Sequence, residues 1–300
     1  MNNLKKSFLL NKISSFLEKN FKIIKILFTI SLLLLIFSTV DLVEALKNFT
    51  KINYLIIFPL SLYLPGLLIS TIKWKYALGT KKTHFELFKI YWISNFFSNF
   101  LPSNIGGDSY KILKLKSEIN SKTILKSVVF DRLTGLIALI LISSILSFIV
   151  YNLTQNIFVI IIPLLALLSL FGLFLISSKL KSKYLLILRK TLNEFKSKFI
   201  NLLLLSFLFD LLCALSLWCY YLMYGYNINF LVILGFFSTI QLINILPISI
   251  NALGIREGLM IYFFSFVGVP FEVSLSLAIL SRIISVIQSS IGGLIFIFWK

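Results

Sequence analysis

Long apolar segments separated by short basic segments run through the whole chain. A membrane-spanning helix needs about 20 mostly apolar residues. Segments that meet this requirement lie at about 26–43, 54–72, 127–150, 157–177, 199–223 and 273–299. Three further apolar segments are shorter or broken, at 87–101, 230–246 and 258–269. The pattern predicts an all-α polytopic membrane protein, forming a single domain over 1–300 without a soluble domain.

Two of the shorter segments, 87–101 and 230–246, end at a Leu-Pro pair followed by a loop of small residues and then charge. The turn residues are Pro102, Gly106 and Gly107 in the first motif, and Pro247 and Gly254 in the second. Proline and glycine at these points would end a helix and let the backbone turn. We therefore expect two re-entrant half-helices. Non-helical backbone at membrane depth must be covered by protein or water, so these half-helices imply a cavity.

The order of segments is the same in two parts of the chain. Each part has two spans, an apolar segment ending at Leu-Pro, a polar turn and then more span. The first part would start inside the cell and the second outside. These features predict an inverted-topology repeat, with repeat A at about 26–150 and repeat B at about 157–299. Paired, interrupted hydrophobic segments of this kind indicate a transporter's binding site.

Composition and charge agree with a membrane protein. The chain is 58% hydrophobic and only 13% charged, whereas a soluble domain carries roughly 25% charged residues. Its net charge of +18 comes from lysines that gather between spans, while 151–156 and 224–229 carry no charge. This distribution follows the positive-inside rule and argues against a nucleic-acid partner. We expect a multi-pass protein of the cell membrane with a cytoplasmic N-terminus.

Arginine is rare in this lysine-rich chain, which makes its positions informative. Arg132, Arg256 and Arg282 lie within or beside apolar segments, where an ionisable group is expensive. The guanidinium suits phosphate and carboxylate groups, so these arginines are candidates for binding an anionic headgroup. The alternative is that they lie at the membrane interface, a reading that has most force for Arg132.

Carboxylates accompany these arginines. Asp131 precedes Arg132 and Glu257 follows Arg256, and adjacent residues of a helix do not face one another. Each charge is therefore expected to pair with another element. Asp108 with Arg132, and Glu257 with Arg282, are options that the sequence leaves open. Asp108 and Glu257 join the substrate-binding candidates, and Asp131 is counted with the structural motif.

Asp210 lies in the middle of a predicted span among leucines. It is a candidate for ion coupling or a structural hydrogen-bond partner, and Asp210→Asn would abolish gradient dependence only in the first case. With His84 as the single histidine, and Cys213 and Cys219 in one span, the chain offers no metal site. No catalytic residue and no cofactor are predicted.

At these motifs the chain resembles the lysylphosphatidylglycerol synthase transmembrane-region family, a flippase-like membrane domain. The resemblance lies in Leu101-Pro102 with Gly106-Gly107-Asp108, Phe130 to Gly135, Leu246-Pro247, Gly254 to Gly258, Gly268-Val269 and Arg282. Two positions depart from the family pattern. Lys111 stands where arginine is expected and is counted with the substrate-binding candidates, and Asn251-Ala252 stands where relatives tend to carry glycine.

The resemblance implies a compact bundle of about eight transmembrane spans with re-entrant elements that acts on lipid headgroups. In the namesake proteins this domain is fused to a soluble aminoacyl-transfer domain and moves aminoacylated phosphatidylglycerol across the membrane. The expected function here is translocation or handling of an anionic, aminoacylated or polyprenyl-linked lipid. The alternative is a membrane-embedded transferase, or its accessory subunit, using a polyprenyl-phosphate or lipid substrate with Glu257 as base. Expected partners are membrane lipids and a separate lipid-modifying or glycosyltransferase enzyme.

Overall fold

The computed structural model describes residues 27–100, 105–179, 196–246 and 248–299. These residues are 86% helical and contain no strand, which confirms the all-α prediction. Four helices are long and apolar enough to cross a membrane, namely Tyr54–Leu78, Ser121–Thr154, Lys196–Met223 and Phe271–Phe298. A fifth is possible if the pair Leu27–Thr39 and Leu42–Lys51, bent by 87°, counts as one span.

This number is lower than the total of about eight that the family resemblance implies. The segment at 87–101 and those at 230–246 and 258–269 form helices too short to span, and α7 (Phe158–Lys179) contributes only a shorter apolar helix over Phe158–Gly172. Hydropathy detects apolar sequence but not the point at which a helix turns back.

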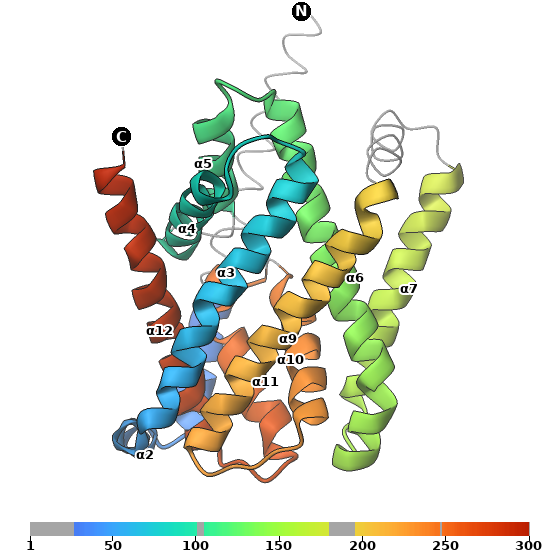
Figure 1. The fold of residues 1–300 in the computed structure, drawn as a ribbon. Coiled ribbons are helices and arrows are strands. Elements are labelled where there is room, and N and C mark those ends of the chain that lie inside the picture. Colours follow the sequence, from blue (N-terminus) through green and yellow to red (C-terminus); the bar gives the residue numbers. More distant parts are fainter. Residues whose placement is uncertain (1–26, 101–104, 180–195, 247, 300) are drawn as a thin grey trace, which may run out of the picture.

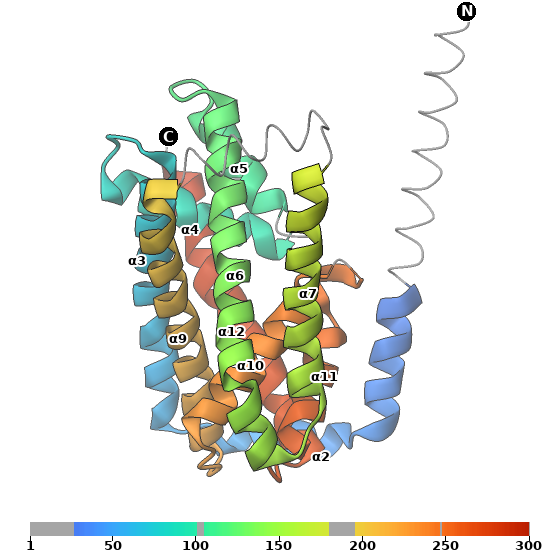
Figure 2. The same cartoon turned by 90° about the vertical axis from the view of Figure 1, so that its right-hand side faces the viewer.

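The bundle consists of long helices with two helix hairpins between them (Figures 1 and 2). The long helices are α3 (Ile57–Leu78), α6 (Ser121–Thr154), α7, α9 (Phe199–Met223) and α12 (Phe271–Phe298). The first hairpin is α4 (His84–Phe100) with α5 (Ile105–Leu115), and the second is α10 (Phe230–Asn244) with α11 (Ile255–Ser265). Short helices α2 (Leu42–Lys47), η1 (Asn48–Lys51), η2 (Tyr54–Ile56), η3 (Lys196–Lys198) and η4 (Ile250–Ala252) join them.

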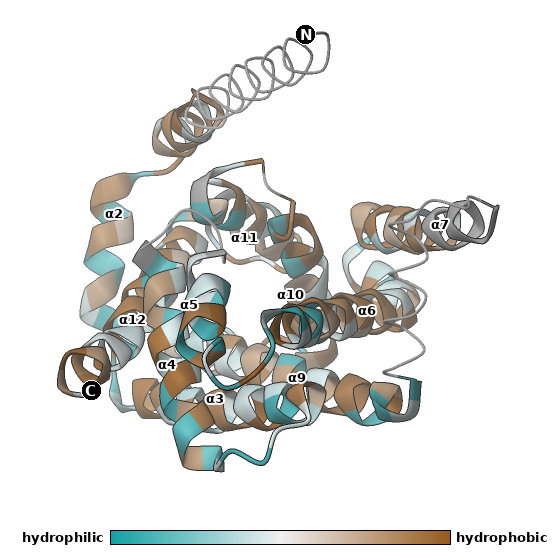
Figure 3. Cartoon of the chain, turned by 90° about the horizontal axis from the view of Figure 1, so that it is seen from above, coloured by the Kyte–Doolittle hydropathy of each residue, from teal (hydrophilic) through white to brown (hydrophobic). Residues whose placement is uncertain are grey.

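The two hairpins enter the bundle from opposite ends. Figure 1 shows α4 and α5 in the upper half and α10 and α11 in the lower half. Seen from above, α7 and Leu27–Thr39 lie at the periphery, while the hairpins lie closer to the centre (Figure 3). The interrupted segments of the sequence therefore form two opposed structures that approach each other in the middle of the bundle.

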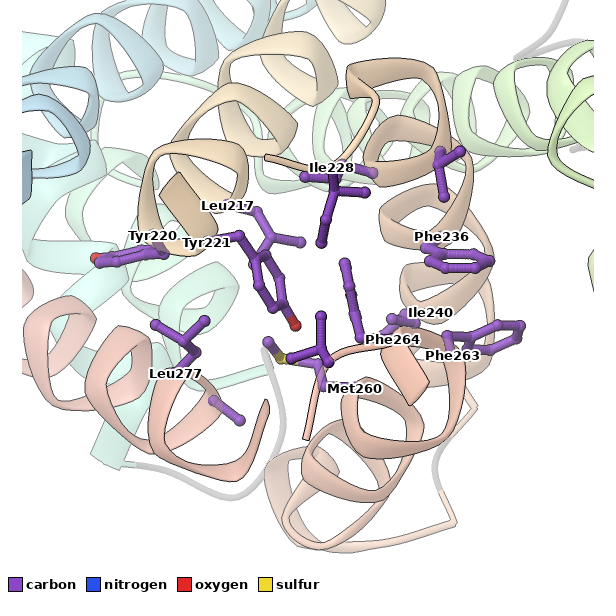
Figure 4. Close-up of a cluster of buried hydrophobic side chains, with 14 of the residues drawn as sticks. Leu217, Tyr220, Tyr221, Ile228, Phe236, Ile240, Met260, Phe263, Phe264 and Leu277 are labelled. Carbon is purple, nitrogen blue, oxygen red and sulfur yellow. The ribbon is translucent and has the colours of Figure 1, made fainter. Parts of the chain in front are cut away.

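Each hairpin packs on its own apolar core. The second hairpin packs in a large cluster of buried side chains that includes residues of α9, α10, α11 and α12 (Figure 4). In this cluster the rings of Tyr221 and Phe264 stack with their centroids 4.1 Å apart. The first packs on a smaller cluster that includes Trp74, Leu87 and Leu115. Both hairpins are therefore held by buried apolar contacts.

The end of the bundle at which α3 ends and α6 and α9 begin, the upper end in Figure 1, carries Lys81, Lys82, Lys116, Lys122 and Lys198, and we call it the basic end. At this end Lys82 bridges Glu86 at 3.2 Å and Glu118 at 2.7 Å. The hydrogen bond to Glu118 raises the pKa of Lys82 above its ordinary value. This bridge closes the base of the first hairpin, since Glu86 lies in α4 and Glu118 follows α5.

Candidate functional site

The two hairpins touch each other beside their turns, and we call the described residues there the tips, namely Asn99, Gly106 and Gly107 in the first hairpin and Asn251 to Gly254 in the second. The side-chain amide of Asn251, between α10 and α11, donates to the carbonyl oxygen of Asn99 near the end of α4 at 3.3 Å. Asn99 in turn donates from Nδ2 to the Ser289 hydroxyl of α12 at 2.7 Å. Pro102 and Pro247, predicted to end the half-helices, lie outside the described residues. The contact joins segments that are 152 residues apart.

Small residues let the chain turn and pack at these tips. At Gly107 a Cβ atom would lie 2.7 Å from the Ser94 hydroxyl, so α5 can approach α4 this closely only with glycine. Gly106, also buried, precedes it in the first turn of α5. Gly254 precedes α11 with a φ of 78°, a conformation that glycine adopts without strain. Helices thus begin close to Asp108 and to Arg256, as the sequence indicates.

In each hairpin the second helix carries a carboxylate in its first turn, and this carboxylate binds an arginine of the following long helix. In the first, Arg132 of α6 donates from Nε to Asp108 Oδ2 at 2.8 Å, and from Nη2 to the same oxygen. In the second, Arg282 of α12 donates from Nε and Nη2 to Glu257 Oε1 at 3.0 and 2.9 Å. The partners are 24 and 25 residues apart. The structure thus forms both pairs that the sequence left open.

Glu257 also organises the second tip. Its other oxygen, Oε2, accepts the backbone N–H of Gly254 at 2.8 Å, and the side chain is buried. Arg282 reaches the carbonyl oxygen of Asn251 at 3.4 Å. Glu257 and Arg282 therefore link α11, the turn before it and α12, and both carboxylate oxygens are occupied.

Adjacent charged residues point to different elements, as expected. Asp131 pairs with Lys73 of α3 at 3.0 Å, while its neighbour Arg132 binds α5. Lys73 also donates to the carbonyl oxygen of Asp131 at 2.8 Å and is itself buried. Sequence reasoning missed Lys73, because it counted this residue with the basic segment that follows the predicted span at 54–72. The sequence offered one signal, which is that Lys73 directly follows the predicted span and precedes the aromatic Trp74.

Lys111 occupies an aromatic environment on the first hairpin. It is 4% exposed, and its Nζ lies 3.9 Å from the ring centroid of Tyr91 and 5.0 Å from that of Trp74. Its Nζ is 3.8 Å from Asp108 Oδ1. Cation–π contacts and one carboxylate thus stabilise its charge away from water. The Lys111 side chain is therefore held by contacts within the protein, next to the Asp108–Arg132 pair.

Asp210 of α9 is 6% exposed, and its Oδ2 has no hydrogen-bond partner among the described residues. The structural alternative, a hydrogen bond from a neighbouring serine or asparagine to this oxygen, is not observed there. Asp210 does not line the cavity described next. A role in ion coupling stays a prediction.

A cavity of about 530 Å³ lies between α3, α4, α9, α10, α11 and α12. Serine, asparagine, glutamine and tyrosine side chains share its wall with apolar residues. Arg256 is the single charged side chain among the described lining residues, and it donates to the Ser281 hydroxyl at 2.9 Å. Of the six substrate-binding candidates, only Arg256 lines this cavity. Asp108, Lys111, Arg132, Glu257 and Arg282 form ion pairs outside it.

The cavity wall includes residues that sequence reasoning did not single out. Asn95 and Asn99 come from α4, Gln241 from α10 and Ser285 from α12. Asparagine and serine are frequent in this chain, so only the fold distinguishes these positions from others of the same type. One signal was available, because Asn95, Asn99 and Gln241 are amide side chains within segments that are largely apolar.

The chain matches a family model over residues 22–293, and the model describes the lysylphosphatidylglycerol synthase TM region. The chain belongs to this family. It matches no curated protein and no solved structure. The lysylphosphatidylglycerol synthase TM region thus includes both hairpins, both carboxylate–arginine pairs and all described residues that line the cavity. The family resemblance of the motifs is confirmed over nearly the whole chain, and the protein is a multi-pass membrane protein.

Proposed function

We propose that this protein moves a lipid from one leaflet of the membrane to the other. In this proposal the headgroup passes through the central cavity while the acyl chains stay in the bilayer. The observation that supports it most directly is a partly polar cavity with a single cation, enclosed by helices whose outer faces are apolar. Such a cavity would offer a headgroup the hydrogen bonds that the hydrocarbon core lacks.

Family membership supports a lipid as the substrate. The family is named for a synthase of lysylphosphatidylglycerol, which is a membrane lipid. The outer surface fits a bilayer, because large apolar side chains such as Leu34, Phe148 and Ile297 are highly exposed on three different helices. A lipid could thus approach the bundle from the side with its acyl chains in contact with these faces.

An inverted repeat would provide the two states that transport needs. In this proposal α3 to α6 of repeat A correspond to α9 to α12 of repeat B. The helix contacts support it, because α4 packs on α12 as α10 packs on α6, and α3 packs on α9. Two units related by a two-fold axis in the membrane plane would form matching contacts of this kind with each other. The matching Asp108–Arg132 and Glu257–Arg282 pairs add a second correspondence.

We further propose that the two hairpins are re-entrant and that the basic end faces the cytoplasm, which would place the N-terminus inside the cell. Alternating access would then come from one repeat rocking against the other around the cavity. Labelling of Thr80→Cys by an impermeant thiol reagent in intact cells would contradict this orientation.

The test is leaflet movement of headgroup-labelled phospholipids in proteoliposomes that hold the wild type or the Arg256→Ala variant. We expect the wild type to accelerate movement and Arg256→Ala to reduce it about tenfold or more, the effect of losing a charge-assisted hydrogen bond. Lys122→Ala removes one positive charge from the exposed start of α6 and serves as the control. Equal movement with wild type and Arg256→Ala would remove Arg256 from the site.

The same samples test the enzyme alternative, because a transferase changes the mass of a lipid and a translocator changes only its leaflet. The geometry gives this alternative less support. Glu257, the proposed base, has one oxygen on Arg282 and the other on the Gly254 N–H, and it does not line the cavity. A change in lipid mass that depends on the protein would favour the transferase.

A further inference from the structure

The charges around the cavity are arranged asymmetrically. Arg256 contributes a guanidinium to the wall, and no described carboxylate lines the same space. Glu257, the adjacent residue, is directed to Arg282 and to the Gly254 N–H. Asp108 is likewise held by Arg132, with Lys111 beside it. The acids nearest to the two hairpin tips are therefore neutralised outside the cavity.

Arg256 has a neutral partner instead. Its Nη2 donates to the Ser281 hydroxyl at 2.9 Å, and Arg256 forms no ion pair with any described residue. A guanidinium carries five N–H donors in a planar fork, which matches two oxygens of a phosphate. The cavity thus holds a positive charge that no described carboxylate of its wall compensates, and an anion would satisfy it.

The rest of the polar wall is uncharged. Asn95, Ser98, Ser216, Gln241 and Ser285 come from α4, α9, α10 and α12 and supply amides and hydroxyls. These groups both donate and accept hydrogen bonds, so they suit hydroxyl groups of a ligand. An ammonium group is held best by a carboxylate, and no described residue of this wall provides one.

We propose that the cavity selects lipids whose headgroup is a phosphate bearing an uncharged, hydroxyl-rich substituent, and that it rejects headgroups with added ammonium groups. Arg256 binds the phosphate and the neutral wall binds the hydroxyls. An aminoacylated headgroup meets the Arg256 charge without a compensating carboxylate, which disfavours it. This selectivity rests on the proposed function, because it assumes that the headgroup passes through the cavity.

Binding and movement are measured separately, so that the two proposals can fail separately. Native mass spectrometry of the purified full chain compares phosphatidylglycerol, lysylphosphatidylglycerol, phosphatidylcholine and a polyprenyl-phosphate sugar. Phosphatidylglycerol and the polyprenyl-phosphate sugar share the proposed chemistry, and their relative binding identifies the source of the headgroup. We expect one or both to bind about tenfold or more tightly than lysylphosphatidylglycerol, because its added ammonium groups meet the Arg256 charge without a compensating carboxylate.

Three variants test the role of Arg256. Arg256→Glu should abolish the preference or reverse it towards lysylphosphatidylglycerol, and Arg256→Lys should retain it in weaker form. Lys122→Glu makes the same reversal of charge on the exposed start of α6 and should leave the preference unchanged. Thermal unfolding identifies any variant that fails to fold, and the comparison among lipids in the wild type does not depend on the variants.

Equal or tighter binding of lysylphosphatidylglycerol by the wild type overturns the proposed selectivity, even if lipids move between leaflets. A preference that survives Arg256→Glu in a folded protein overturns the assignment to Arg256. The expected preference without any leaflet movement supports the selectivity and contradicts translocation, which leaves the cavity as a binding site. Absence of binding by all four lipids overturns the proposed selectivity.

Discussion

At the scale of single residues, the ion pair between the buried Glu257 and the partly buried Arg282 ties the turn of the second hairpin to α12. The Arg282 guanidinium places both Nε and Nη2 on one oxygen of Glu257, and the other oxygen receives the Gly254 N–H. Arg282 also reaches the Asn251 carbonyl. A single carboxylate therefore fixes a turn that contains left-handed backbone at Asn251, Ala252 and Gly254.

A double-mutant cycle should show this coupling. Glu257→Ala leaves Arg282 without its carboxylate in a mostly buried place, and should lower the free energy of unfolding by about 3 kcal/mol. Arg282→Ala should cost a similar amount, and the double variant less than the sum, by about 1–3 kcal/mol. Unfolding in detergent, followed by tryptophan fluorescence, measures all four proteins. Additive effects would show that the two side chains act independently.

The residue scale also shows where sequence reasoning stops. The rule that adjacent helical residues face different partners was enough to predict that Asp131 and Arg132 bind separate elements. It could not identify Lys73 as the partner of Asp131, because the pair joins α3 to α6 and is 58 residues apart. Which of many lysines becomes buried depends on how helices pack, and local sequence carries little of that information.

At the scale of helices, glycines decide how closely α12 approaches the first hairpin. A Cβ atom on Gly292 would lie 2.7 Å from the carbonyl carbon of Trp92, and one on Gly293 would lie 2.7 Å from the Phe96 ring. The Trp92 indole donates to the Gln288 carbonyl at 2.9 Å, one turn before Gly292. The contact of α4 with α12 thus combines a close backbone approach with a hydrogen bond that depends on it.

We expect Gly292→Ala to separate α4 from α12 and to lower the free energy of unfolding by about 1–3 kcal/mol, the usual cost of overpacking. Gly172→Ala in α7 is the matched control, because a Cβ there meets no atom within 4 Å. Its effect should be neutral or stabilising by up to about 1 kcal/mol, since alanine favours helix. Thermal unfolding of both variants measures the difference, and equal stability would contradict close packing at Gly292.

Helix boundaries near the motifs were predictable because proline and glycine act locally. The first hairpin helix was expected over 87–101 and is α4, His84–Phe100. The second was expected over 230–246 and is α10, Phe230–Asn244. The bend of 87° between Leu27–Thr39 and the helices up to Lys51 was not predicted, because the span expected at 26–43 runs across it, although the polar residues Ser38, Thr39 and Asp41 stand at the break. An apolar pattern shows which residues are buried in lipid or protein, but it does not show the direction in which each helix runs.

At the scale of the whole molecule, the cavity depends on two hairpins from opposite ends that meet between the long helices. Their tips are joined where Asn251 donates to the Asn99 carbonyl at 3.3 Å. If the repeats rock against each other during transport, this contact must change in each cycle, because it links α4 of repeat A to the turn before α11 of repeat B. A bond across the tips that cannot open should therefore stop movement.

Cysteines at Asn99 and Asn251, in a protein whose Cys213 and Cys219 are replaced by alanine, permit this test. A short bifunctional thiosulfonate should join the two tips in the same molecule, since the residues are in contact. We expect leaflet movement to fall to the rate of empty liposomes after cross-linking and to recover when a reductant cleaves the link. Each single-cysteine variant, treated in the same way, controls for the modification itself.

Movement that continues in fully cross-linked protein would mean that the headgroup crosses without separation of the tips, as in a fixed groove. The cavity would then act as a static polar path, and the inverted repeat would matter for its shape and not for its motion.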